Sequence, residues 1–234
     1  MSALIRALQY ATTTGFCLLA LASVWRWRSV RDRVRAYLAL AISLLALVAL
    51  LGQAGRLTDY RYGILFDVSL VAFLASGYFL LMFRHEFLPL SRASRVVSAV
   101  AVAGLGAAAI AARLPYEESP EYSSGQNLLI LGIVAAWMLC VGEPIVRFWR
   151  ASKQRPAVQR ARLRALSLAY GGIVAILVVS VTVHPERSSA LAVAIQILTL
   201  LLIPLLLVSF APPRWLRRVW RGGRRMTSSS LTIC

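Results

Sequence analysis

Long runs of apolar residues alternate with short polar segments along the whole chain. Seven of these runs have about the length, roughly 20 residues, that an α-helix needs to cross the hydrocarbon core of a bilayer. The pattern therefore predicts an all-α, polytopic integral membrane protein with seven transmembrane helices. The predicted membrane domain is 1–211, with spans at 7–25, 36–54, 63–83, 96–112, 127–146, 165–183 and 190–211, and the remainder, 212–234, is a basic juxtamembrane tail.

Basic residues are concentrated in alternate connecting segments, which predicts an orientation. The rich segments are residues 26–35, 84–95, 147–164 and 214–225. The segments on the opposite side carry only Arg6, Arg56, Arg61, Arg113 and Arg187. Because cytoplasmic loops of membrane proteins are enriched in Lys and Arg, we expect the N-terminus outside, the C-terminus in the cytoplasm, and the protein in the cell inner (plasma) membrane.

The composition changes how the high charge is interpreted. A net charge of +17 in a soluble chain would favour nucleic acid as a partner. Here 59% of the residues are hydrophobic and mean hydropathy is +0.70, so the charge is explained by membrane orientation. We therefore expect anionic lipid headgroups, and no nucleic acid, beside the basic segments.

Asp67 is the most informative polar residue inside a predicted span, because a carboxylate there normally faces the bundle interior or water. It lies about one turn inside the outer end of the third span. Residues expected at a similar depth on other spans are Thr12, Thr13, Thr14, Gln53 and Gln196. Of these, Thr13, Gln53 and Gln196 are predicted to form a ligand pocket with Asp67 that is open to the outside. The alternative is that Asp67 reaches water or pairs with Arg61 or Arg56.

Glu143 is the second acidic residue inside a span, near the inner end of the fifth. Arg147 follows four residues later on the same helix face, which favours a local ion pair. A proton relay is the alternative interpretation.

No set of residues predicts catalysis, a metal site or a cofactor. The only lysine, Lys153, lies in a loop and cannot hold retinal, and His85 and His184 lie at opposite ends of the predicted bundle. Asp67 and Glu143 sit at opposite depths, so they do not make a catalytic carboxylate pair. We expect no enzymatic activity.

Two features predict how the helices pack. The fourth span is rich in Ala, Val and Gly, and small residues let helix backbones approach closely, so we expect this helix at the centre of the bundle. The similar motifs at 31–35 and 160–164 suggest parallel three-helix repeats joined by the fourth helix, as in some small transporters. Alternating arginine and apolar residues at an inner interface explain the same motifs without a repeat.

The tail begins with a basic amphipathic segment. A helix starting at Pro212 and Pro213 would place tryptophans against the bilayer and arginines against anionic headgroups. The residues expected at this interface are Arg214, Trp215, Arg217, Arg218, Trp220 and Arg221.

Seven spans, the arginine-rich segment 154–164 and the exit Phe210-Ala-Pro-Pro-Arg-Trp-Leu-Arg217 together give a resemblance. Residues 1 to about 221 resemble the N-terminal membrane sensor (input) region of signal-transduction proteins from high-GC, actinobacterial-type bacteria, such as sensor histidine kinases. The resemblance implies a sensor of a small molecule or membrane property, with a cytoplasmic signalling protein or a second copy of the chain as partner. The family's effector residues have no matching positions here, which leaves open a truncated input half or a stand-alone bundle. The alternative functions are a small solute transporter or channel with parallel three-helix repeats, and a structural membrane subunit that binds no ligand.

Overall fold

The computed structural model describes residues 3–116, 122–153, 157–183 and 189–210. Within these ranges the chain is all-helical, without strands, and each predicted span except residue 211 lies inside a helix. All seven helices are long and apolar enough to cross a membrane. The helices are α1 (Ala3–Val30), α2 (Arg33–Leu57), α3 (Gly63–His85), α4 (Arg92–Ala112), α5 (Ser124–Ser152), α6 (Ala157–Val183) and α7 (Ser189–Phe210).

Short polar side chains cap the N-termini of several helices and so determine where these helices begin. Asp32 caps α2 by accepting a hydrogen bond from the backbone N–H of Val34, and Ser91 caps α4 in the same way through Ser94. Ser123 caps α5 in a reciprocal capping box with Gln126. These contacts satisfy backbone donors that the first helical turn leaves without partners.

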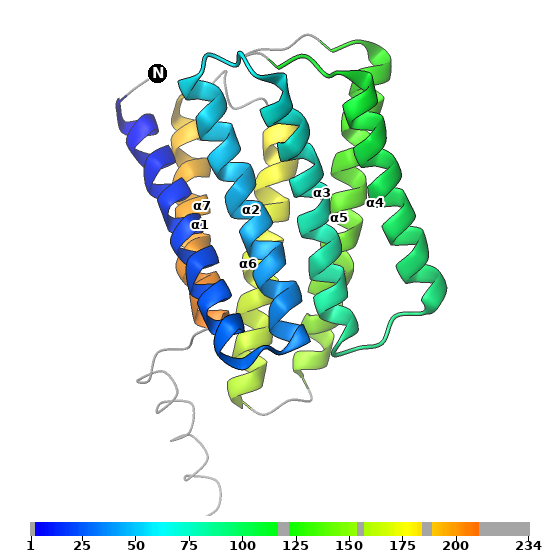
Figure 1. Ribbon diagram of the computed structural model, residues 1–234. Helices are drawn as coiled ribbons and strands as arrows, with labels where there is room; N and C mark the ends of the chain where they lie inside the picture. Colours follow the sequence, from blue (N-terminus) through cyan, green and yellow to red (C-terminus); the bar gives the residue numbers. More distant parts are fainter. Residues whose placement is uncertain (1–2, 117–121, 154–156, 184–188, 211–234) are drawn as a thin grey trace, which may run out of the picture.

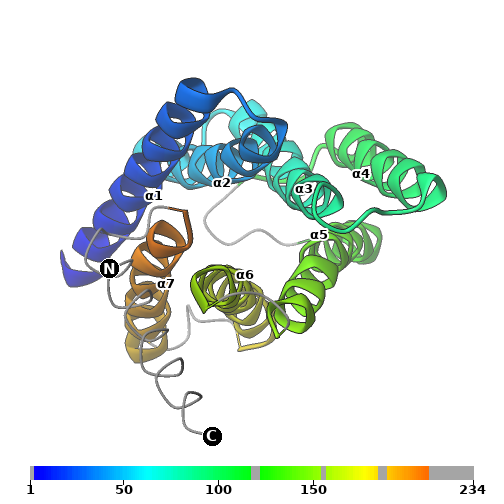
Figure 2. The same cartoon turned by 90° about the horizontal axis from the view of Figure 1, so that it is seen from below.

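Six helices form a closed ring in the order α1, α2, α3, α5, α6, α7, with α7 packed back on α1 (Figure 2). Each helix contacts its two neighbours in the ring. The main core lies inside and includes the fully buried side chains of Ile42, Trp137, Tyr170 and Leu206. Because the ring closes, the first three and the last three helices meet along two contacts, α1 with α7 and α3 with α5.

Helix α4 lies outside this ring, against α3 and α5 (Figures 1 and 2), so its predicted central position is wrong. Only a narrow face of α4 is buried, with Ala109 packed against Leu74 and Ile133. Val97 and Val100 on its other face are each 66% exposed. Small residues permit close helix packing but do not require it, and this helix uses them on one side only.

Successive helices run in opposite directions, so the connecting segments alternate between two ends of the bundle (Figure 1). The end where α1, α3 and α5 finish is called here the arginine-rich end. The end where α2, α4 and α6 finish is the arginine-poor end. Between the ends, large apolar side chains stay exposed on the outer surface, including those of Leu21, Val97, Leu128 and Leu139.

Candidate functional site

An ion pair between the buried Arg84 and the partly exposed Glu143 joins α3 to α5 near the arginine-rich end. Nη2 of Arg84 lies 2.9 Å from Oε1 of Glu143, and the Arg84 side chain is only 6% exposed. The same carboxylate oxygen lies 3.3 Å from Nε of Arg147, one turn further along α5, where the sequence predicts an ion pair. Glu143 is thus shared between an arginine inside the bundle and a more exposed one at its surface.

Part of this polar cluster has no hydrogen-bond partner in the part of the chain that the structure describes. Nε and Nη1 of Arg84 and Oε2 of Glu143 are buried and make no hydrogen bond with any described residue. Buried polar groups in proteins are normally hydrogen-bonded, and exceptions often mark a functional role or a bound water. The cluster can therefore donate several further N–H groups, accept one further hydrogen bond, and exchange Glu143 between two arginines.

Arg84 is not among the site residues predicted from the sequence, because the pattern of basic residues places it in a connecting segment. The position continues the buried face of α3, because Gly77, Leu80 and Leu81 precede it at helical spacings and are also buried. That continuation was the available signal. An arginine on the buried face of a span needs an acidic partner, and Glu143 lies at the same end of the bundle.

Two further hydrogen bonds, one buried and one partly buried, join α5 to its neighbours. Nε1 of Trp137 donates to Oγ of Ser76 at 3.0 Å, and the indole stacks on Phe73 with ring centroids 4.6 Å apart. Oγ of Ser167 on α6 donates to the carbonyl oxygen of Ile145 at 3.2 Å. Helix α5 is therefore fixed to both of its ring neighbours by polar contacts inside the core.

The residues of the predicted ligand pocket fall into two groups at the arginine-poor half of the bundle. Oγ1 of Thr12 lies 3.4 Å from Oε1 of Gln196, which joins α1 to α7. The threonine that meets Gln196 is Thr12, while the predicted Thr13 is half-buried beside it. Gln53 and Asp67 lie on α2 and α3, and the described contacts do not link them to Thr12 and Gln196.

Asp67 is half-buried, and its carboxylate makes no hydrogen bond or ion pair with any described residue. Of the two arginines considered as partners, Arg56 instead donates from Nε to Oε1 of Gln53 at 3.0 Å. Arg61 is exposed in the connection that leads into α3. The Asp67 carboxylate is therefore available to a ligand that reaches this depth.

An aromatic cluster that the sequence analysis did not predict covers the ends of α2 and α3. Tyr116, which follows α4, stacks on Phe66 and meets the ring of Tyr60 edge to face, with centroids 5.2 and 5.0 Å away. Its hydroxyl lies in the space that a side chain at Gly55 would need. Burial is the largest cause that raises the pKa of Tyr116, and the neighbouring Tyr60 raises it further. The charge of Arg56 lowers this pKa by a smaller amount, so the hydroxyl stays protonated at neutral pH.

The interface residues predicted in the tail, Arg214 to Arg221, lie outside the described residues. Among the described residues, no group of three or more His, Cys, Asp or Glu side chains could hold a metal ion. No protein family matches the chain, and neither does any curated protein or solved structure.

Proposed function

We propose that the chain is a multi-pass protein of the plasma membrane, with its arginine-rich end in the cytoplasm and its N-terminus outside. The apolar side chains exposed around the bundle support this placement, because a water-soluble bundle turns its polar face outward. The uneven distribution of arginine between the two ends supports the orientation.

Within that membrane placement, we propose that the bundle is a sensor-type input module without catalytic activity of its own. The observation that carries this proposal is the pair of charged residues on α3. Asp67 near one end has no described partner, and Arg84 at the other end is buried and held by Glu143 of α5. A stiff helix connects a candidate binding residue outside to an exchangeable ion pair inside.

In the proposed mechanism, ligand binding at Asp67 is coupled through α3 to the ion pair of Arg84 and Glu143. A ligand shifts a conformational equilibrium only by its difference in affinity for the two states. A ligand bound at Asp67 favours one position of α3, and a displaced α3 moves Arg84 relative to Glu143. Glu143 then retains Arg147, so the carboxylate stays paired while the contact between α3 and α5 changes. A signalling protein or a second copy of the chain would detect that change at the cytoplasmic end.

The test uses the full chain in lipid nanodiscs, screened with a small-molecule library by thermal unfolding. A compound that stabilises the wild type against thermal unfolding should not stabilise Asp67→Asn. It should still stabilise Asp59→Asn, which removes an exposed carboxylate at the same end. Spin labels at Glu86 and Val146 should then report a changed distance between α3 and α5 when the compound binds.

Three results would contradict the sensor. Equal stabilisation of wild type and Asp67→Asn would remove Asp67 from the binding site. Binding at Asp67 without any change in the distance between α3 and α5 would remove the relay. Loss of folding in Asp67→Asn itself would assign the carboxylate a structural role.

One observation favours a second candidate, a small transporter with two three-helix halves. Helix α4 lies outside the ring and packs on α3 and α5, as a linker between repeats would. Rocking of α1–α3 against α5–α7 would then occur at the contacts of α1 with α7 and of α3 with α5. Uptake of the stabilising compound into proteoliposomes would favour the transporter, and binding without uptake would favour the sensor.

A further inference from the structure

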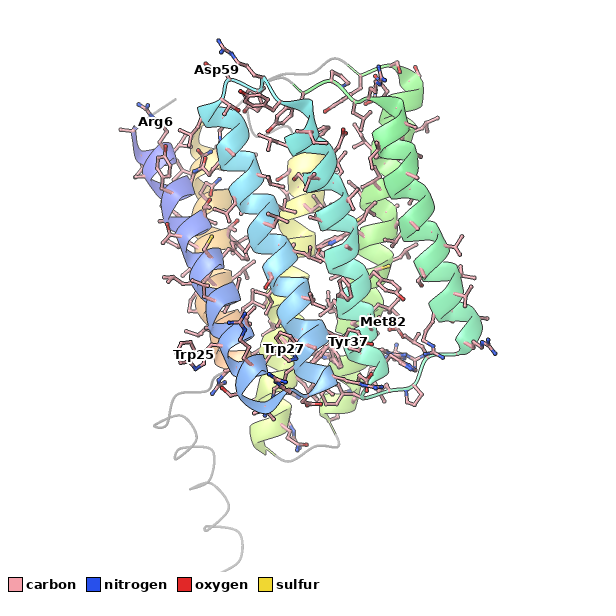
Figure 3. All side chains as sticks on the ribbon, viewed as in Figure 1. Arg6, Trp25, Trp27, Tyr37, Asp59 and Met82 are labelled. Carbon is pink, nitrogen blue, oxygen red and sulfur yellow. The ribbon has the colours of Figure 1, made fainter. Side chains whose placement is uncertain are left out.

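A hollow of about 600 Å³ lies at the arginine-rich end, where α1 ends. Its described lining is Trp27, Arg28 and Arg31. Figure 3 places Trp27 on the side of α1 toward α2, whereas Trp25 lies on the outer side. This hollow is separate from the ion pair of Arg84 and from the polar residues at the opposite end.

The turn between α1 and α2 brings the two arginines together. Arg31 adopts a left-handed backbone conformation with φ of 49°, and its N–H donates to the carbonyl oxygen of Trp27 at 2.7 Å. This hydrogen bond ends α1, and only Asp32 separates Arg31 from the start of α2. The turn follows directly on the last turn of α1, and Trp27, Arg28 and Arg31 line the same hollow.

The described part of the chain places no acidic partner against the positive charge of this hollow. Among the described residues, no carboxylate lies within ion-pair distance of Arg28 or Arg31. The nearest acidic residue in sequence, Asp32, accepts a hydrogen bond from the N–H of Val34 at 3.3 Å as the cap of α2. The hollow also lies next to the N-terminus of α2, where the helix dipole favours anions.

We propose that this hollow binds the phosphate of one anionic phospholipid of the inner leaflet. Two guanidinium groups recognise a phosphodiester through charge-assisted hydrogen bonds. Trp27 adds an amphipathic ring that suits the boundary between headgroups and acyl chains. The site rests on the proposed membrane placement and orientation, and it does not depend on the sensor mechanism.

Native mass spectrometry of the full chain, released from nanodiscs of phosphatidylcholine with phosphatidylglycerol, tests the site. The wild type should retain one phosphatidylglycerol. The double variant Arg28→Gln/Arg31→Gln should retain it about 100-fold more weakly, because each lost arginine removes a charge-assisted hydrogen bond to the phosphate. The control Arg33→Gln/Arg35→Gln removes the same charge from the next turn and should change retention little. Circular dichroism establishes that each variant is folded. If the double variant does not fold, the single variants Arg28→Gln and Arg31→Gln are measured in its place.

Several outcomes would overturn the proposal. If both double variants lose phosphatidylglycerol retention equally, the lipid is attracted to the basic end in general and not to this hollow. Equal retention of phosphatidylcholine would mean that the charge is not recognised. Displacement of the lipid by millimolar inorganic phosphate would identify a free phosphate as the ligand. A chain that does not assemble in nanodiscs would overturn the membrane placement as well, whereas an assembled chain without selective retention would overturn this site alone.

Discussion

The guanidinium of Arg84 is held inside the bundle by a single carboxylate oxygen of Glu143. Taking an ion pair out of water is costly, and the loss of one partner leaves an unpaired buried charge. Arg147 is in a different position, because its side chain is 57% exposed and water can solvate it. The two arginines that share Glu143 should therefore contribute very differently to stability.

We predict that Glu143→Leu lowers the free energy of unfolding by about 2 kcal/mol, since Arg84 would lose its only ionic partner among the described residues. Arg147→Leu, the matched control, should cost less than about 0.5 kcal/mol. The double variant Arg84→Leu/Glu143→Leu should recover most of the loss. Unfolding by sodium dodecyl sulfate in mixed micelles measures all three.

Equal losses from Glu143→Leu and Arg147→Leu would contradict the assignment, because the surface pair would then be the stabilising one. At the residue scale, the sequence predicts the pair of Glu143 with Arg147, since both lie on one helix at a fixed spacing. It does not predict Arg84 as the second partner. That contact depends on which helices are neighbours, and a single helix pattern does not contain this information.

The same limit applies to the predicted outer pocket. Sequence depth alone groups Thr13, Gln53, Asp67 and Gln196, because each lies a similar distance from the end of its span. The structure joins Gln196 to Thr12 and engages Gln53 with Arg56. Depth follows from counting residues along a span, but the direction in which a side chain points depends on the rotation of each helix in the ring.

At the scale of whole helices, glycines distinguish tight contacts from open faces. A side chain at Gly77 of α3 would meet the Trp137 ring at 2.8 Å, and that ring is completely buried. Gly104 of α4 has nothing within 4 Å of the same position. The first glycine allows α3 and α5 to approach, whereas the second lies on the exposed face of an outer helix.

We predict opposite effects of alanine at these two glycines. Gly77→Ala should destabilise the protein by about 1–3 kcal/mol, because the buried indole has no room to move. Gly104→Ala should be neutral or stabilising by up to about 1 kcal/mol, because alanine favours the helix without a clash. Thermal unfolding in detergent compares the two. Destabilisation by Gly104→Ala as large as that by Gly77→Ala would place α4 in a tight interface.

The residue ranges of the helices can be predicted from the sequence, because each apolar run has a length that can be counted. Which helices are neighbours in the bundle cannot be predicted in this way. In a membrane, lipid chains are as apolar as a neighbouring helix, so the outward face of α4 carries the same kinds of residue as a buried face. The residue composition of 96–112 therefore predicts a helix but not its place outside the ring.

At the scale of the whole molecule, the apolar surface and the basic residues define the same axis, which runs along the bundle from one end to the other. The ring presents apolar side chains around its circumference, and the basic residues collect at one end. The ion pair of Arg84 and Glu143 and the hollow beside Trp27 both lie at that end. If it faces the cytoplasm, the ion pair adjoins soluble partners and the hollow adjoins the inner leaflet, so both proposals depend on one orientation.

The orientation is tested by placing single cysteines at the two ends of α3, after Cys17, Cys140 and Cys234 are replaced by serine. Tyr62 and Glu86 flank this helix, and both side chains are exposed. A membrane-impermeant maleimide added to intact cells should label Tyr62→Cys and leave Glu86→Cys unmodified until the membrane is permeabilised. The reverse pattern would invert the bundle and place the Trp27 hollow in the outer leaflet. Labelling of both cysteines in intact cells would mean that α3 does not cross the membrane, which would remove the basis for relaying a signal from Asp67 to Arg84.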